Sequence, residues 1–345
     1  MAVTDSFPTT PSLRWQDVAP TAVVLLVAYG VVPFLAPGYL IEAILLPFLA
    51  LSLAGVGLNL VTGYCGQLSL GSAAFMAVGA FAAYNFDLRV PGLPLVGSIV
   101  LAALVGAAFG IVFGLPSLRI RGFYLAVSTL AAQFFVQWAL TKFGWFSNDS
   151  PSGVISAPRI EVAGVPFDGA VGRYLFAVTT VLLVTGLAAR LVAGPTGANM
   201  IAVRDNETAA RVIGVPVLRT KLVAFAVSSA IIAVAGVIWA FASLRTVEPA
   251  GFNLDRSFQI LFIVIIGGLA SIRGAFLGAA FIVVLPLLLS NVASILFGGA
   301  VDSGTLELVQ RILLGLLVIL FLIAEPEGLS AVVERVRSRL AHATA

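Results

Sequence analysis

Apolar stretches separated by short polar segments run along almost the whole chain. A helix that crosses the bilayer core needs about 20 predominantly apolar residues, and the stretches divide into about ten segments of that order. The eighth is too short to span comfortably, so we expect it to be broken or re-entrant. The pattern predicts an all-α polytopic membrane protein with about ten transmembrane helices, at residues 19–36, 39–60, 67–86, 93–114, 122–141, 171–193, 222–243, 258–270, 274–297 and 309–324.

The distribution of positive charge predicts how the chain is oriented. With ten crossings both termini lie on one side, and that side collects twelve of the 19 lysine and arginine residues. The positive-inside rule therefore places both termini in the cytoplasm. We expect a cytoplasmic N-terminal tail at 1–18, a transmembrane domain at 19–324 with a cytoplasmic loop at 194–221, and a cytoplasmic C-terminal tail at 325–345.

Composition agrees with this assignment and excludes several kinds of chemistry. Hydrophobic residues make up 60% of the chain and charged residues 10%, with a mean hydropathy of +1.09, which is typical of membrane proteins. The net charge of +3 indicates membrane insertion rather than binding to nucleic acid. The single cysteine, Cys65, and the single histidine, His342, exclude an intrachain disulfide and a His/Cys metal cluster. We expect no metal, no cofactor and no catalytic residue.

Glycines and polar side chains interrupt the apolar sequence between residues 59 and 86. Inside lipid an irregular backbone must find its hydrogen bonds within the protein or along a water-filled path. Broken helices of this kind form substrate sites in transporters. We therefore predict that the segment lines a path for a solute, and the residues assigned to it here are Asn59, Thr62, Gln67, Ser69 and Gly71.

The predicted fifth crossing carries a second group of polar side chains. Thr129, Gln133, Gln137 and Thr141 recur every four residues and so share one face of a helix. Glutamines that face lipid are costly, so this face should meet protein or water. Two interpretations stay open: hydrogen bonds between helices, and a lining for the path by Thr129, Gln133 and Gln137.

The loop at 194–221 predicts a short surface helix over residues 204–213. Asp205 or Asn206 can act as N-cap, and Gly214 can end the helix. Its small apolar face has no core of its own to enter, so it either docks on a cytoplasmic partner or lies on the membrane interface. The residues assigned to a contact with a partner are Arg204, Asp205, Asn206, Glu207, Ala209, Ala210, Arg211 and Gly214.

Other glycines indicate close packing of helices. Gly106, Gly110 and Gly114 repeat at four-residue spacing in the fourth predicted crossing, which lets backbones approach closely in lipid. The Gly-rich segments 63–82 and 267–281 suggest counterparts in two halves of five crossings each. An odd number of crossings per half makes such halves inverted repeats, a plan common among transporters.

Several motifs together resemble the permease subunits of high-affinity branched-chain amino acid ABC importers, the LivM-type proteins. The resemblance covers residues 58–329 and is carried by NLVTGYCGQLSLGSAAF (59–75), GLPSLRIRGFYLAVSTLA (114–131), AVRDNETAARVIGVPVLRTKLVAFAVSSAIIAVAG (202–236), IIGGLASIRGAFLGAA (265–280) and PEGL (326–329). It implies a bacterial-type plasma membrane, a second homologous permease subunit, two cytoplasmic ATPase subunits docked on short coupling helices and an extracytoplasmic solute-binding protein, with lipid around the assembly.

The expected function is that of the transmembrane subunit of an ATP-driven importer. No phosphate-binding loop is present, since neither Lys142 nor Lys221 follows a glycine, so ATP hydrolysis belongs to separate subunits. Ser72, Gln259 and Arg273 depart from the family pattern, which leaves the substrate open among branched-chain amino acids, urea, amides and small carboxylates. The alternatives are an ion-coupled carrier, disfavoured because acidic residues lie near the ends of the crossings, and a passive channel for a solute such as urea.

Overall fold

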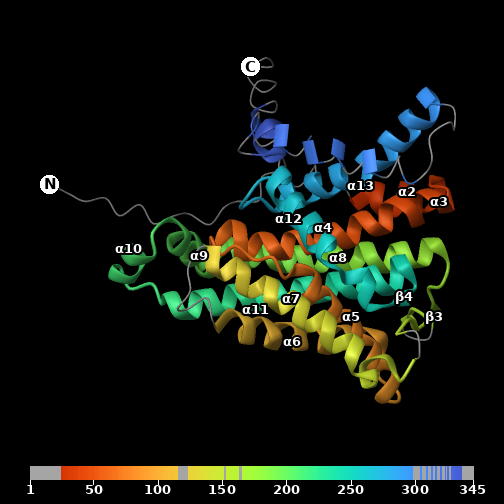
Figure 1. The fold of residues 1–345 in the computed structure, drawn as a ribbon, viewed down its shortest axis with the longest axis horizontal. Coiled ribbons are helices and arrows are strands. Elements are labelled where there is room, and N and C mark those ends of the chain that lie inside the picture. Colours follow the sequence, from red (N-terminus) through yellow and green to blue (C-terminus); the bar gives the residue numbers. More distant parts are fainter. Residues whose placement is uncertain are drawn as a thin grey trace.

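A computed structural model describes residues 25–115, 123–150, 153–162 and 165–297, together with scattered positions between 304 and 335. Helices run along the long axis of the molecule, and short strands lie at the end opposite to α10 (Figure 1). The all-α class is confirmed. The helices are η1 (Val27–Val31), α2 (Val32–Leu35), α3 (Gly38–Leu40), η2 (Ile41–Leu45), α4 (Leu46–Asn59), η3 (Leu60–Tyr64), α5 (Ser72–Arg89), α6 (Leu95–Gly114), α7 (Phe123–Lys142), η5 (Gly144–Ser147), α8 (Ala170–Ala193), α9 (Pro195–Asp205), α10 (Glu207–Val212), α11 (Val217–Val237), η6 (Ile238–Leu244), η7 (Pro249–Phe252), α12 (Leu254–Gly267) and α13 (Ile272–Phe297).

Six helices among the described residues are long and apolar enough to cross a membrane. They correspond to the second, fourth and sixth to ninth predicted crossings, and the predicted total of ten is not confirmed. Parts of the first and tenth predicted crossings lie outside the described residues. The six helices are Gly38–Tyr64, Leu95–Gly114, Ala170–Ala193, Val217–Leu244, Pro249–Gly267 and Ile272–Val292.

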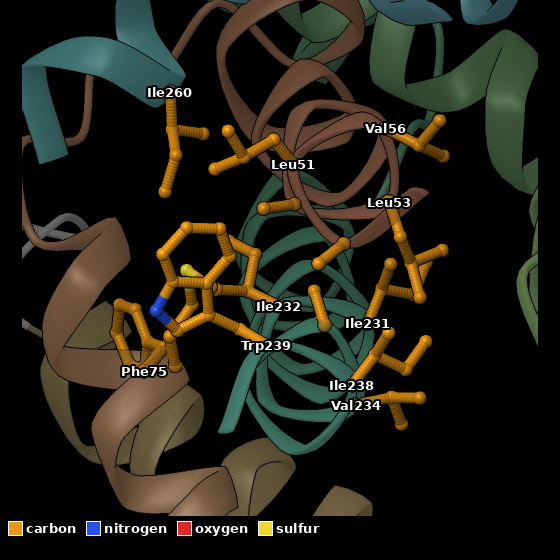
Figure 2. Packing of buried hydrophobic residues seen from close by; sticks show 14 of the residues in the cluster. Leu51, Leu53, Val56, Phe75, Ile231, Ile232, Val234, Ile238, Trp239 and Ile260 are labelled. Atoms are coloured by element: carbon orange, nitrogen blue, oxygen red, sulfur yellow. The ribbon is translucent and has the colours of Figure 1, made fainter. Parts of the chain in front are cut away.

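Helices α4 and α11 form the centre of the bundle. Twelve of the 14 residues of α4 are buried, and α11 packs against α4, α5 and α6. Figure 2 shows Phe75 of α5 and Ile232 of α11 beside Trp239, with Leu51 of α4 and Ile260 of α12 above its ring. Outer helices instead expose large apolar side chains, such as Leu187 of α8 at 69%, as expected of a surface that meets lipid.

Small residues bring these helices together at backbone contact. A Cβ added to Gly106 would lie 2.5 Å from Ala233 Cβ, and one added to Gly110 would lie 2.4 Å from Ser229 Oγ. Both neighbours belong to α11, as does Phe225, which lies 3.0 Å from the corresponding position at Gly114. The predicted packing role of these three glycines is confirmed.

Two small antiparallel sheets lie between the helices at the end opposite to α10. Strand β1 (Ile155–Ser156) pairs with β4 (Thr246–Val247), and β2 (Glu161–Val162) pairs with β3 (Val165–Pro166). The first pairing ties the segment after α7 to the segment after η6. The segment between α7 and α8 is therefore held onto the bundle by short strands.

Candidate functional site

The chain leaves helical conformation between Tyr64 and Ser72. Helix Gly38–Tyr64 ends there, residues 66–71 have irregular backbone, and α5 begins at Ser72 rather than at residue 67 as predicted. Gly66 has a φ of +69°, a conformation that favours glycine. The interruption expected between residues 59 and 86 is thus present, and we call residues 65–71 the first break.

Asn59, the last residue of α4, binds a second non-helical segment. Its side chain is fully buried and meets the turn between α12 and α13, which we call the second break (residues 268–271). Asn59 Nδ2 donates to the carbonyl of Ser271 at 2.8 Å and to that of Gly268 at 3.4 Å, while Oδ1 accepts from the Ala270 N–H at 2.9 Å. The amide therefore holds the second break against the end of α4.

The other polar residues of the first break form local contacts. Thr62 Oγ1 donates to the Gln67 carbonyl at 3.2 Å, and the Gln67 N–H donates to the Val61 carbonyl at 2.8 Å. Ser69 is buried, whereas the side chains of Thr62 and Gln67 are half-buried. Thr62 and Gln67 thus fold the break back on the end of its own helix.

The polar face of α7 meets the end of the first break. Thr129 Oγ1 accepts from the Leu70 N–H at 2.9 Å, and a Cβ on Gly71 would lie 2.8 Å from the Thr129 carbonyl oxygen. One turn later, Gln133 Nε2 donates to the Phe252 carbonyl at 2.8 Å. Thr129 and Gln133 therefore make contacts between elements, which is one of the two interpretations left open.

Ser257 completes this network and was missed by reasoning from the sequence. Ser257 Oγ accepts from the Ala73 N–H at 2.9 Å and donates to Gln133 Oε1 at 3.1 Å. The start of α5 is therefore bound to Ser257 of α12, which is itself bound to Gln133 of α7. Gln137 is not part of this network, since its carbonyl accepts from Thr141 within α7.

Arg256, next to Ser257, is a second residue that the sequence reasoning missed. Its guanidinium carbon lies 4.0 Å from the centre of the Trp239 ring, and Nη1 donates to Gln259 Oε1. Trp239 belongs to η6 and is 6% exposed. The eighth crossing was expected to begin at residue 258 and to be too short, whereas in the structure it begins at Pro249 and is 19 residues long, so that it includes Arg256. A cation just before an apolar segment was the available signal, since a charge inside a crossing is costly and marks function.

The predicted short helix is present as α10, but it is shorter than residues 204–213 because Arg204 and Asp205 belong to α9. Arg204 and Asp205 end α9, where Asp205 Oδ1 accepts from Arg204 Nε at 3.0 Å. Asn206 is the N-cap of α10, and its Oδ1 accepts from the N–H groups of Thr208 and Ala209, both at 3.0 Å. Of the two candidate caps only Asn206 is used, since its extended backbone (φ −159°) interrupts the helix.

Helix α10 is fixed to the bundle through Glu207. Lys221 Nζ of α11, 1% exposed, lies 3.0 Å from Glu207 Oε2, and Arg211 lies 3.3 Å from Oε1. Ala210 is buried, so it does not belong to the exposed face, whereas Ala209 and Val212 are exposed. Gly214, with a φ of +89°, lies after the helix at the position predicted to end it.

Arg204 connects this end of the molecule to the first break. Its Nη1 donates to the Gly63 carbonyl at 3.2 Å, and a Cβ on Gly66 would lie 2.8 Å from its Cγ. The side chain thus covers the backbone where helix Gly38–Tyr64 ends. A displacement of α9 would be transmitted directly to the first break.

Comparisons with known proteins agree with this architecture. A family model described as branched-chain amino acid transport system / permease component matches residues 40–322. The high-affinity branched-chain amino acid transport system permease protein LivM of Salmonella typhimurium is 31% identical over 300 residues, which cover 80% of this chain and 66% of that protein. This chain therefore spans slightly less than two thirds of the length of that relative.

More distant relatives match over most of their length. The probable branched-chain amino acid transport permease protein LivM of Methanocaldococcus jannaschii is 26% identical, with 84% of this chain and 93% of that protein covered. The L-arabinose transport system permease protein AraH of Escherichia coli is 24% identical, with 76% and 81% covered. No solved structure matches the chain. Together with the membrane-spanning helices, these matches show that the chain belongs to the family of branched-chain amino acid transport system permease components.

Proposed function

We propose that this chain is the non-catalytic membrane subunit of an ATP-driven importer. Its substrate is a small solute, and branched-chain amino acids are the leading candidates. The observation that carries the proposal is the contact of Arg204 with Gly63 and Gly66. This contact links α9, at the end of the molecule that carries α10, to the first break inside the bundle. An importer driven by external ATPases needs such a link between the docking surface and the path.

The surface of α10 supports its role as the docking site for an ATPase. Val212 and Ile213 are 82% and 74% exposed, and α10 projects from the end of the bundle (Figure 1). Exposed apolar patches on projecting elements mark contacts with other proteins. The buried ion pair of Glu207 with Lys221 holds α10 on α11, so force on α10 reaches the bundle. The rival interpretation places the same face on the membrane interface.

The first break supports a path for the solute. Thr62 and Gln67 combine half-exposed polar side chains with irregular backbone, and Gly71 and Ser69 lie where the break meets α7. Asn59, Thr129 and Gln133 hold this backbone in place, while Gln137 extends the polar face of α7. The assembly would comprise a second homologous permease subunit, two ATPase subunits and an external solute-binding protein, with both termini of this chain in the cytoplasm.

Reconstitution in proteoliposomes tests the proposal. We expect uptake of leucine to require ATP, the ATPase subunits and the binding protein, and Ala209→Asp with Val212→Asp to abolish ATPase co-purification and uptake. The control is Ala198→Asp, which adds a charge to an exposed residue of α9 and should leave both intact. Uptake that requires an ion gradient instead of ATP would show an ion-coupled carrier, and uptake that requires no energy source would show a passive channel; either result would overturn the proposal.

A further inference from the structure

The N-termini of two helices meet halfway along α7. Ser257, in the first turn of α12, accepts from the N–H of Ala73, the second residue of α5. Both lie beside Gln133, the eleventh of the 20 residues of α7. At 1.5 Å per residue this point is about 15 Å from either end of that helix. Both N-termini are therefore inside the bundle.

The two helices then run in opposite directions. Helix α5 ends at Arg89, which donates to the Trp145 carbonyl beyond the end of α7. Helix α12 ends at the second break, beside Asn59. The positive ends of two helix dipoles thus face one region from opposite sides, an arrangement that favours a negatively charged group of a solute.

Unpartnered donors gather in the same region. Trp239 Nε1, Arg256 Nε and Ser72 Oγ are buried and have no hydrogen-bond partner among the residues that the structure describes. Ser72 is 1% exposed and begins α5, and Trp239 is 6% exposed and stacks on Arg256. In Figure 2 the nitrogen of Trp239 points toward the side on which Phe75 of α5 lies. Buried donors without partners are rare because each is costly.

One side of the region is open at the surface of this chain. Asn253 and Asp255, the residues just before Arg256, are exposed, although Phe252 is bonded to the middle of α7. A carboxylate at this depth cannot face lipid without a large cost. The exposed side must therefore face water or another subunit, and the half-buried Arg256 lies next to it along the chain.

We infer that Arg256 binds a carboxylate group of the translocated solute, with Trp239 Nε1 and Ser72 Oγ as additional donors. The inference rests on the proposed function and narrows its substrate to small carboxylates, amino acids included, over urea, amides and sugars. A guanidinium matches the two oxygens of a carboxylate. The N-terminus of α5, which has no side-chain cap and no acidic residue in its first turn, adds to the attraction. Helix α12 adds less, because Asn253 caps it and Asp255 lies in its first turn.

The experiment compares Arg256→Gln with Arg159→Gln, a control at a side chain that is 81% exposed, in the reconstituted complex. Because loss of a charge-assisted hydrogen bond is worth about tenfold or more, leucine uptake should fall by about that factor in Arg256→Gln. Arg256→Lys should recover part of it. ATP hydrolysis and assembly should match the control. Leucine uptake at the control rate in Arg256→Gln overturns the inference.

A second pair of variants tests the inference even if the Arg256→Gln variant does not assemble. Trp239→Phe keeps an aromatic ring beside Arg256 but removes the indole N–H together with the five-membered ring that carries it, so the KM for leucine should rise several-fold. Trp138→Phe, at a residue 54% exposed, is its control, and equal KM values in the two variants would overturn the inference. Uptake of urea or a sugar, neither of which has a carboxylate, by the unaltered complex would also overturn the inference. Whether that uptake requires ATP tests the proposed function separately.

Discussion

Asn59 illustrates how a polar side chain inside a membrane bundle positions the backbone. Its amide makes three hydrogen bonds to residues 268–271, more than 200 positions along the chain. In an apolar interior a backbone group without a partner is costly, and of the three groups only the Ser271 carbonyl is seen to have a second partner, the Ala275 N–H. Asn59 was assigned to the solute path, and its contacts indicate that it would act there by fixing the shape of the second break.

We expect Asn59→Ala to lower the free energy of unfolding by about 2–4 kcal/mol, because it removes the hydrogen bonds of Asn59 to the Ala270 N–H and the Gly268 carbonyl and leaves the Ser271 carbonyl with the Ala275 N–H alone. The measurement is the Tm of the purified chain in detergent. Ser52→Ala is the matched control, since Ser52 is equally buried but donates only to the Phe48 carbonyl of its own helix. Equal Tm values for the two variants would show that the bonds of Asn59 do not stabilise the fold.

At the scale of elements, α5 and α11 touch through their backbones. A Cβ on Gly236 would lie 2.0 Å from the Met76 carbonyl oxygen, and one on Gly79 would lie 2.2 Å from the Ala233 carbonyl oxygen. The two glycines therefore interlock from opposite helices. Contact of this kind lets dispersion forces act where the hydrophobic effect is absent. It also fixes α5, whose first turn contributes Ser72 to the Arg256 region.

Gly236→Ala should separate α5 from α11 and destabilise the protein, because the methyl group meets a backbone atom that cannot rotate away. Overpacking of this kind costs about 1–3 kcal/mol, to be read as a lower Tm and reduced leucine uptake. Gly186→Ala in α8 is the control, since nothing lies within 4 Å of its added Cβ. A Tm for Gly236→Ala at or above that of the control would contradict the close contact.

Local patterns predicted the elements better than their mutual contacts. Six of the apolar crossings, the first break and the glycine contacts of α6 depend on nearby residues and are found in the structure. The helix expected over 204–213 is present as the shorter α10, and its first residue could not be fixed because Asp205 and Asn206 are both good caps and sequence alone does not say which is used. Ser257 and Arg256 were missed because Ser257 meets Ala73 across 184 positions, and no local periodicity reports such pairs.

At the scale of the whole molecule, the two ends differ in kind. One end carries α9 and α10, with Arg204 and Glu207 in ion pairs. The other carries the strand pairs β1–β4 and β2–β3 (Figure 1). Under the proposed function the first end meets ATPases in the cytoplasm and the second meets a binding protein outside. The excess of basic residues assigned to the side of α10 supports this orientation.

Thiol labelling of intact cells tests that orientation. Ser156→Cys in β1 and Thr208→Cys in α10 both place a thiol at an exposed position, at opposite ends of the bundle. We expect a membrane-impermeant maleimide to label residue 156 in sealed cells and residue 208 only after permeabilisation. The unaltered chain is the control, because its single cysteine, Cys65, is 0% exposed and should stay unlabelled in both conditions. Labelling of residue 208 but not 156 in sealed cells would reverse the orientation, and α10 would then face away from any cytoplasmic ATPase.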